Sequence, residues 1–185
     1  GKTILVTGAA AAVGHYVTQI ATLRGARVIG TASAVRADHA RDAGAAEVID
    51  YKSEGVAARV KELTGGRGAD AIIDMDFSST SKLLPEGALA PHGKLVCYGS
   101  NVAADIPVNF PAMLWGSVTL QMFLVYELTP ADRVAAIADL QALLRDGRLR
   151  HTIGARYPLD AIAEAHEAVE SGKVIGNVVV DTVTG

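Results

Sequence analysis

Six short runs of β-branched and aliphatic residues alternate with helical patterns between residues 4 and 123 of this chain. The first five runs are continuously apolar, which is typical of strands in a sheet whose two faces are both covered by helices. The intervening lengths suit right-handed crossovers between parallel strands. The alternation therefore predicts an α/β fold built on a doubly wound, parallel six-stranded sheet. The expected strands are Ile4 to Val6, Arg27 to Thr31, Glu47 to Tyr51, Asp70 to Met75, Lys94 to Gly99 and Ser117 to Phe123.

Helices are expected between these strands. In the first, Val13, Val17 and Ile20 share one helical face, and Gly25 supplies a C-terminal stop at the end of a helix that runs to Leu23. The same reasoning predicts further helices at Val35 to Ala43, Gly55 to Leu63 and Ser79 to Leu89.

The pattern changes after the sixth strand. Thr129 followed by Pro130 is typical of a helix start, and we expect that helix to run to about Arg145 and stop at Gly147. An extended piece TIGARYPL, a helix from Asp160 to Ser171 and a final strand GNVVVD follow. The sequence therefore predicts a nucleotide-binding domain over residues 1–147 and a C-terminal β-α-β appendage over residues 148–185.

Composition limits the possible functions. The 185 residues are 50% hydrophobic and carry a net charge of −3, so the chain can bury a core, and its overall charge suggests neither a nucleic-acid groove nor an anionic membrane surface. No apolar run reaches the roughly 18 residues of a membrane span. Cys97 is the single cysteine, which excludes an internal disulfide and a multi-cysteine zinc site and fits a reducing cytoplasm. We expect no metal.

The turn between the first strand and the first helix reads VTGAAAAVGH, from Val6 to His15. In a dinucleotide-binding turn, three glycines allow the tight turn, the close approach of the pyrophosphate and the packing of the helix on the strand. The corresponding positions here are Ala9, Ala11 and Gly14, with Gly8 just upstream. A plain turn of small residues is one reading. A phosphate site is the other, because free N–H groups and the positive end of a helix dipole favour an anion.

The end of the second strand carries a further indication. A site for NAD places an acidic residue there to bind the ribose 2′-hydroxyl, whereas a site for NADP replaces it with a cation. This sequence has no acid between Gly30 and Arg36, and Ser33 and Arg36 could both bind a 2′-phosphate. Alternatively, Arg36 is a solvated residue at the start of the next helix.

The segments TILVTGAAAAVGHYVTQIA, GARVIGTAS, GAAEVIDYKSE, TGGRGADAIIDM, HGKLVCYGS and YPLDAIAEAHEAVESGKVIGNVVVD resemble, in this order, the cofactor half of the medium-chain dehydrogenase/reductases. The subgroup they resemble most is the zinc-independent, zeta-crystallin-like quinone oxidoreductases. The resemblance implies a Rossmann sheet that binds NADP(H), and an enzyme that transfers hydride to a quinone or another activated alkene without a metal. It also implies a homodimer formed through strand six.

The resemblance also implies roles for individual residues. The turn would hold the pyrophosphate, the ends of strands two and three the 2′-phosphate, the segment after strand five the nicotinamide ribose, and the backbone after strand six the carboxamide. The cofactor-binding residues are, in that order, Gly8, Ala9, Ala10, Ala11, Ala12, Val13 and Gly14; Ser33, Arg36 and Tyr51; Gly99, Ser100 and Asn101; and Met122, Phe123 and Leu124. No catalytic residue is assigned in this chain.

This sequence departs from the family pattern at three places. Ala11 and Ala12 replace two glycines of the turn, and Ala37 stands where bacterial members have a lysine that Arg36 would replace. The N-terminal domain that forms the other wall of the substrate cleft in relatives is missing, so we expect a fragment whose segment 148–185 would return to that domain. Alone, the chain would have weak activity or none.

Two other functions remain open at this point. One is an enoyl-thioester reductase domain of a larger synthase, and the other is a non-catalytic assembly module whose alanine-filled turn no longer accepts a dinucleotide. Other chemistry has little support. Asp74 and Asp76 lack a third ligand, and Cys97 reads as a buried apolar residue. His15 could approach a phosphate, but the sequence favours a solvated or packing histidine.

Overall fold

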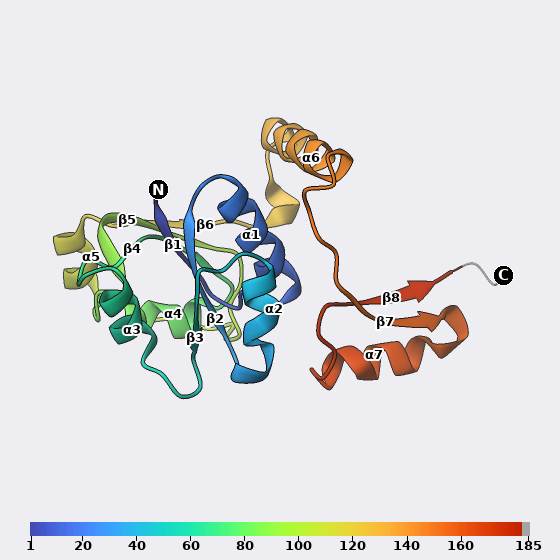
Figure 1. The fold of residues 1–185 in the computed structure, drawn as a ribbon. Coiled ribbons are helices and arrows are strands. Elements are labelled where there is room, and N and C mark those ends of the chain that lie inside the picture. The colour runs from blue at the N-terminus through green and yellow to red at the C-terminus, as the bar shows by residue number, and fades with distance from the viewer. Residues whose placement is uncertain (183–185) are drawn as a thin grey trace.

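The computed structural model describes residues 1–182 and contains two sheets (Figure 1). The larger is a parallel six-stranded sheet with the strand order β3-β2-β1-β4-β5-β6. Its strands are β1 (Thr3–Val6), β2 (Arg27–Ala32), β3 (Glu47–Asp50), β4 (Ala69–Asp74), β5 (Leu89–Cys97) and β6 (Thr119–Met122). The predicted doubly wound sheet is confirmed.

Helices cover both faces of this sheet (Figure 1). On one side lie α1 (Ala12–Leu23) and α2 (Ala37–Asp42), the latter preceded by the 3₁₀ turn η1 (Ala34–Arg36). On the other side lie α3 (Val56–Leu63), α4 (Phe77–Thr80), η2 (Ser81–Leu83) and α5 (Phe110–Gly116).

Neighbouring residues of each strand supply the two separate cores. Leu5 and Ile29 belong to the cluster on the α3 side, whereas Val6 and Val28 belong to the cluster on the α1 side. Successive side chains of a strand point to opposite faces, so a strand buried on both faces needs apolar residues at consecutive positions. This is the physical reason for the continuous apolar runs in the sequence.

The strand order reverses at β1, which pairs with β2 on one edge and with β4 on the other. The connections that leave β1 and β4 therefore run to opposite faces of the sheet and leave a crevice beyond the carboxyl ends of these strands. In open α/β sheets such a crevice is the usual ligand position.

The region between β4 and β5 differs from the expected helix over residues 79–89. The helical part ends at Leu83, and β5 already begins at Leu89. Gly87 has a φ of +81°, and Ala88 N–H donates to Leu83 O, so the chain turns out of the helix there. The expected helix was therefore too long, and the expected strand at Lys94 began five residues too late. The short helix α5 was not expected at all.

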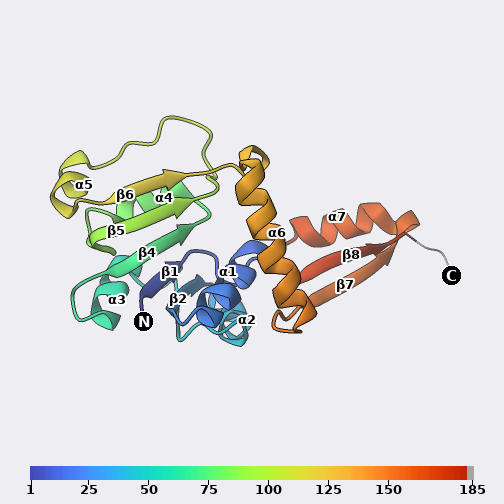
Figure 2. The same cartoon turned by 90° about the horizontal axis from the view of Figure 1, so that it is seen from above.

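The C-terminal part extends away from the large sheet, as Figures 1 and 2 show from two directions. After β6 comes the short η3 (Val125–Glu127), and then the long helix α6 (Pro130–Arg145), which begins at the Thr129 cap, whose hydroxyl accepts from Asp132 N–H. A parallel pair follows, β7 (Ile153–Pro158) and β8 (Asn177–Asp181), joined through η4 (Leu159–Ala161) and α7 (Ile162–Glu170). The predicted β-α-β appendage is confirmed.

Two contacts hold this appendage against α1. The Gln19 side chain accepts from Arg150 N–H at 2.8 Å and donates to Arg150 O at 3.1 Å, and Tyr16 shares a 2.9 Å hydrogen bond with His151.

Within residues 1–182, no helix is long and apolar enough to cross a membrane.

Candidate functional site

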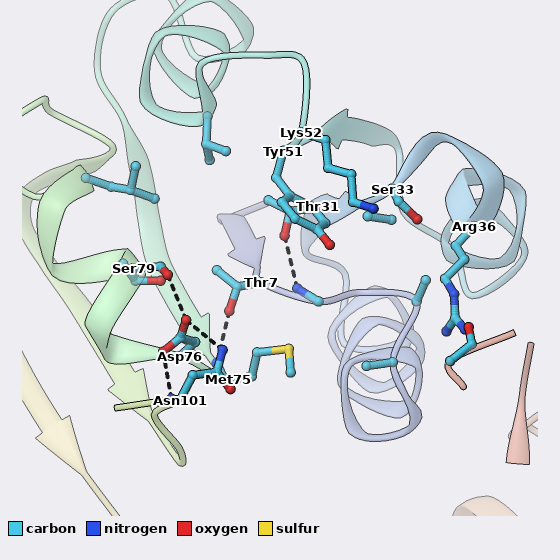
Figure 3. Close-up of a pocket in the computed structure, with 18 of the residues that line it drawn as sticks. Thr7, Thr31, Ser33, Arg36, Tyr51, Lys52, Met75, Asp76, Ser79 and Asn101 are labelled. Atoms are coloured by element: carbon cyan, nitrogen blue, oxygen red, sulfur yellow. Dashed lines mark hydrogen bonds between the residues drawn. The ribbon is translucent and has the colours of Figure 1, made fainter. Parts of the chain in front are cut away.

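A pocket of about 750 Å³ lies at the carboxyl ends of β1, β2, β3 and β4, in the crevice where the strand order reverses (Figure 3). This volume is in the range of pockets that hold small molecules and cofactors. Its lining residues come mainly from the β1–α1 turn, the ends of β2 and β3, the loops after β4 and β5, and the loop before β8. They include Thr7, Gly8, Ala10, Ala11, Thr31, Ser33, Arg36, Tyr51, Lys52, Met75, Asp76, Ser79, Asn101 and Gly172.

The β1–α1 turn adopts its shape without strain at the alanines. Gly8 takes the left-handed conformation with a φ of +65°, and a Cβ at this position would lie 2.0 Å from Met75 Sδ. Ala11 has a φ of −81°, and among the described residues only His92 and Ser117 are non-glycines with positive φ. The substitution of glycine by alanine in this turn therefore costs no backbone strain.

Hydrogen bonds fix the turn to the neighbouring strand. Gly8 N–H donates to Thr31 Oγ1 at 3.0 Å, and Ala9 N–H donates to Thr31 O at 2.9 Å. Helix α1 starts at Ala12, and its first residues have no intrahelical acceptor for their N–H groups, as in any helix. These N–H groups and the helix dipole would favour an anion at this turn.

Gly14 keeps the helix close to the turn. A Cβ on Gly14 would lie 2.1 Å from Gly8 O, a distance that no real side chain tolerates. Gly14 therefore acts as the packing glycine of the turn, in agreement with its position in the sequence pattern.

The ends of β2 and β3 form the cationic part of the pocket. Ala32 pairs with Asp50 in the sheet, so Ser33 and Tyr51 follow at neighbouring positions, and both line the pocket. Lys52 lines it as well (Figure 3). The end of β2 carries no carboxylate, as the sequence indicated.

The Arg36 side chain lines the pocket but has partners elsewhere. Its Nη2 donates to Gly172 O and, at 3.0 Å, to Val174 O, both in the loop before β8. Arg36 therefore connects the first part of the chain to the C-terminal appendage, a role that the sequence did not indicate.

The opposite end of the pocket contains Asp76 and Asn101. The Asp76 carboxylate accepts from Asn101 N–H at 2.9 Å, from Asn101 Nδ2 at 3.0 Å, and from the hydroxyls of Ser78 and Ser79. Burial alone would raise the pKa of Asp76, but these hydrogen bonds to the charged form lower it to about 2. Asp76 thereby holds the loop after β5 against the loop after β4.

Asp74 lies beneath the pocket and is fully buried. Its Oδ1 accepts from Thr7 Oγ1 at 2.9 Å, from Thr80 Oγ1 at 2.7 Å and from Asp76 N–H at 3.1 Å. These bonds join β1, β4 and α4. The other oxygen of Asp74, Oδ2, is buried and has no hydrogen-bond partner among the described residues. In Asp76, by contrast, both carboxylate oxygens accept hydrogen bonds from the protein.

Not all of the expected cofactor residues line the pocket. The structure brings together Gly8, Ala10, Ala11, Ser33, Arg36, Tyr51 and Asn101. Ala9 and Gly14 are buried in the turn, and Ala12 and Val13 open the helix beside it. Gly99 and Ser100 belong to the loop that Asp76 holds, whereas Met122, Phe123 and Leu124 lie outside the pocket at the exposed end of β6.

The two remaining candidate residues, His15 and Cys97, are buried and do not line the pocket. His15 is buried and stacks on His39, and Cys97 is buried at the end of β5, where burial raises the pKa of its thiol. Among residues 1–182, no three His, Cys, Asp or Glu side chains are grouped so that they could hold a metal ion.

Comparison with known proteins gives a consistent result. Residues 43–180 match the model of a family described as zinc-binding dehydrogenase. A quinone oxidoreductase of Pseudomonas aeruginosa is 34% identical over 183 residues, which cover 97% of this chain and 56% of that protein. A 2-haloacrylate reductase of a Burkholderia species is 30% identical over 184 residues, which cover 97% of this chain and 55% of that protein.

A solved structure of the Escherichia coli quinone oxidoreductase complexed with NADPH superposes with a TM-score of 0.83 at 28% identity, covering 98% of this chain and 57% of that one. The chain thus spans little more than half the length of these relatives. The family name implies zinc, but the described residues offer no group of ligands that fits it. With its matched family model and its Rossmann architecture, the chain belongs to the zinc-binding dehydrogenase family of the medium-chain dehydrogenase/reductases, in the quinone oxidoreductase subgroup, and has the fold of their cofactor-binding domain.

Proposed function

We propose that this chain is the NADP(H)-binding part of an oxidoreductase. The observation that carries the proposal is that one pocket joins an unstrained phosphate-type turn, Gly8 to Gly14, to a strand end that bears Ser33 and no carboxylate. A pyrophosphate and a 2′-phosphate are both anions, and this pocket has helix N–H groups at one wall and cationic side chains at another. The NADPH complex of the Escherichia coli relative supports the same cofactor.

In this proposal, each part of the pocket binds one part of the cofactor. The backbone from Gly8 to Gly14 would bind the pyrophosphate, and Ser33, Arg36 and Tyr51 would surround the 2′-phosphate. The loop Gly99, Ser100 and Asn101, which Asp76 holds in place, would contact the nicotinamide ribose. The backbone of Met122, Phe123 and Leu124 would meet the carboxamide, which requires that the cofactor extend beyond the pocket toward β6.

The whole protein would transfer a hydride to a quinone or another activated alkene. Reduced nicotinamide supplies the hydride when it is bound, and the residues of this chain orient it and exclude water. The names of two relatives, a quinone oxidoreductase and a 2-haloacrylate reductase, support this range of substrates.

The substrate wall would come from a further domain. Residues 1–147 would form the nucleotide domain, and the segment from residue 148 would pack on that further domain. The exposure of apolar residues on the helix α6, including Val134 and Ile137, supports a covering partner there.

A homodimer through β6 belongs to the same proposal. This strand is the edge of the large sheet, and Met122 and Phe123 at its end are exposed, as is Trp115 on the neighbouring α5. An open edge with apolar neighbours favours pairing with a second copy. Sedimentation of the chain at several concentrations would test the dimer.

Calorimetric titration of the chain with NADPH and with NADH tests the proposal. Binding of NADPH with a clear preference over NADH is the expected result, and no heat with either would favour an assembly module. A protein that also carries the preceding half of the relatives should then oxidise NADPH with quinones. Turnover with enoyl-CoA thioesters but not with quinones would instead favour an enoyl-thioester reductase.

A further inference from the structure

The Arg36 guanidinium and the Lys52 ammonium are the two cationic groups that line the pocket, and they have different surroundings. Arg36 directs one guanidinium nitrogen to two backbone carbonyls of the loop before β8, Gly172 O and Val174 O. Figure 3 shows this side chain extending toward the C-terminal segment. Part of its donor capacity is therefore already used by the protein.

Lys52, in contrast, forms no ion pair with a carboxylate in residues 1–182. The two nearest acids in the sequence have other partners. The Asp50 carboxylate accepts from Lys52 N–H at 3.1 Å and from Ser53 Oγ at 3.0 Å, and Glu54 accepts from Asp50 N–H at 2.8 Å. Glu54 also lies 3.8 Å from Arg59 Nε.

The same bonds hold the backbone that carries Lys52. The Asp50 carboxylate closes a turn by accepting from Lys52 N–H and Ser53 Oγ, so the end of β3 has a defined conformation. Because Ala32 pairs with Asp50, this turn lies next to the end of β2, where Ser33 begins the following loop. Figure 3 shows the Lys52 side chain extending from the end of β3 toward the end of β2.

We propose that Lys52, rather than Arg36, supplies the principal positive charge that distinguishes a 2′-phosphorylated adenosine from one with a free 2′-hydroxyl, acting beside the Ser33 hydroxyl. This inference rests on the proposed NADP(H) function. It assigns the preference for a 2′-phosphate to a residue that follows β3, outside the segment after β2 where the sequence is usually read for cofactor specificity. Arg36 holds the loop 172–174 at the rim of the pocket and contributes less to the discrimination.

The test uses two small probes that differ only in the 2′-phosphate, adenosine 2′,5′-bisphosphate and adenosine 5′-phosphate. Their affinities for the chain are measured by calorimetry at low salt, together with those of NADPH and NADH. In Lys52→Met, we expect the preference for the 2′-phosphorylated probe to fall about tenfold, the scale of one lost hydrogen bond to a charged group. The affinity for adenosine 5′-phosphate should not change.

Two further variants make the assignment specific. Lys61→Met removes an exposed lysine on α3 that does not line the pocket, and it should keep the full preference. Arg36→Met should reduce the preference by less than Lys52→Met does. In the original chain the preference should also shrink as salt is added, because an exposed ammonium is screened.

The outcomes separate the two proposals. If the original chain prefers the 2′-phosphorylated probe and Lys52→Met keeps that preference, or if Arg36→Met removes more of it, the assignment to Lys52 is wrong and the NADP(H) function stands. If the original chain binds neither NADPH nor the bisphosphate, both proposals are wrong.

Discussion

The imidazole rings of His15 and His39 stack face to face, with centroids 4.1 Å apart and an interplanar angle of 6°. His15 comes from α1 and His39 from α2, so the stack joins the two helices that cover one face of the sheet. Both side chains are buried. His15 follows the packing glycine Gly14 of the proposed cofactor turn, and protonation of either ring would place a charge between the two helices.

The stack predicts a loss of stability in mild acid. Burial lowers the pKa of His15, and a positive charge on His39 would lower it further. Burial also lowers the pKa of His39. The nearby Asp42 carboxylate raises the pKa of His39, and the Arg36 guanidinium lowers it. The unfolded chain therefore takes up these protons first as the pH falls. The free energy of unfolding should be highest above about pH 6.5, the ordinary histidine value, and should fall below it. Urea unfolding at pH values from 8 to 5 measures this.

Two variants separate this pair from the other titrating groups. The double variant His15→Gln/His39→Gln should lose the decline between pH 7 and 5.5, whatever its absolute stability. His166→Gln removes an exposed histidine on α7 and should leave the decline unchanged. An unaltered decline in the double variant would show that the stack is not its cause.

Gly14→Ala tests the packing of α1 on the turn. The added Cβ would meet Gly8 O at 2.1 Å, and this atom belongs to the backbone and cannot move aside as a flexible side chain can. We expect the free energy of unfolding to fall by about 1–3 kcal/mol, as for other overpacked sites, and NADPH binding to weaken with it. Urea denaturation measures the first effect and calorimetry the second.

Gly55→Ala is the matched control for this substitution. A Cβ on Gly55 would make only an ordinary contact of 3.7 Å with Ala58 Cβ, and its φ of −73° suits alanine. Gly55 is the N-cap of α3, where alanine is less favourable than glycine, so a loss below about 1 kcal/mol is expected, smaller than that of Gly14→Ala. Equal losses in the two variants would contradict the packing role of Gly14.

Much of the fold could be predicted because strands that are buried on both faces, such as β1 with Leu5 on one side and Val6 on the other, leave continuous apolar runs in the sequence. The start of β5 could not be predicted from the sequence. Leu89 pairs with Ala69, but the strand is then interrupted by a kink at His92, whose φ is +59°, before regular pairing resumes at Lys94. The helix α5 carries a local signal that was missed: Asn109 Oδ1 accepts from Ala112 N–H, followed by a proline in the first turn.

Those parts of the site that lie within one continuous segment could be predicted from the sequence. They are the β1–α1 turn and the absence of a carboxylate after β2. Lys52 was missed because its place beside Ser33 depends on the register between β2 and β3. The contact of Arg36 with Gly172 joins residues far apart in the sequence, and no local pattern encodes it.

Ala11→Gly asks whether restoring a family glycine helps the turn. Because Ala11 already has a φ of −81°, glycine relieves no backbone strain, and it adds freedom to the unfolded chain. Ala11 is also the N-cap of α1, where glycine is preferred to alanine, so the two effects oppose each other. We expect the free energy of unfolding to change by less than about 1 kcal/mol. Calorimetry should find an NADPH affinity within about threefold of the original, since less than about 0.7 kcal/mol would be at stake. A tenfold tighter complex would show that the methyl group obstructs the pyrophosphate.

Asp74→Ala tests the buried connection beneath the pocket. Asp74 Oδ1 accepts three hydrogen bonds, and alanine removes this acceptor from the hydroxyls of Thr7 and Thr80 and from Asp76 N–H. A loss of about 1–3 kcal/mol in the free energy of unfolding is expected for a broken buried network of this kind. Asp38→Ala, at a carboxylate that is 95% exposed, is the control and should change the stability little.

Asp76→Ala tests how the loop after β5 is held. The variant removes the acceptor of both Asn101 N–H and Asn101 Nδ2, so the Asn101 amide should exchange with solvent faster, measured by hydrogen exchange. In the original chain the same loosening should appear as the pH falls below 3.8 toward about 2, because hydrogen bonds favour the charged carboxylate until it is protonated. Asp105→Ala, at an exposed acid in the same loop region, should leave the exchange unchanged. If the Asn101 amide exchanges equally fast with and without the Asp76 carboxylate, the loop is held by other contacts, and Asp76 does not position the proposed ribose site.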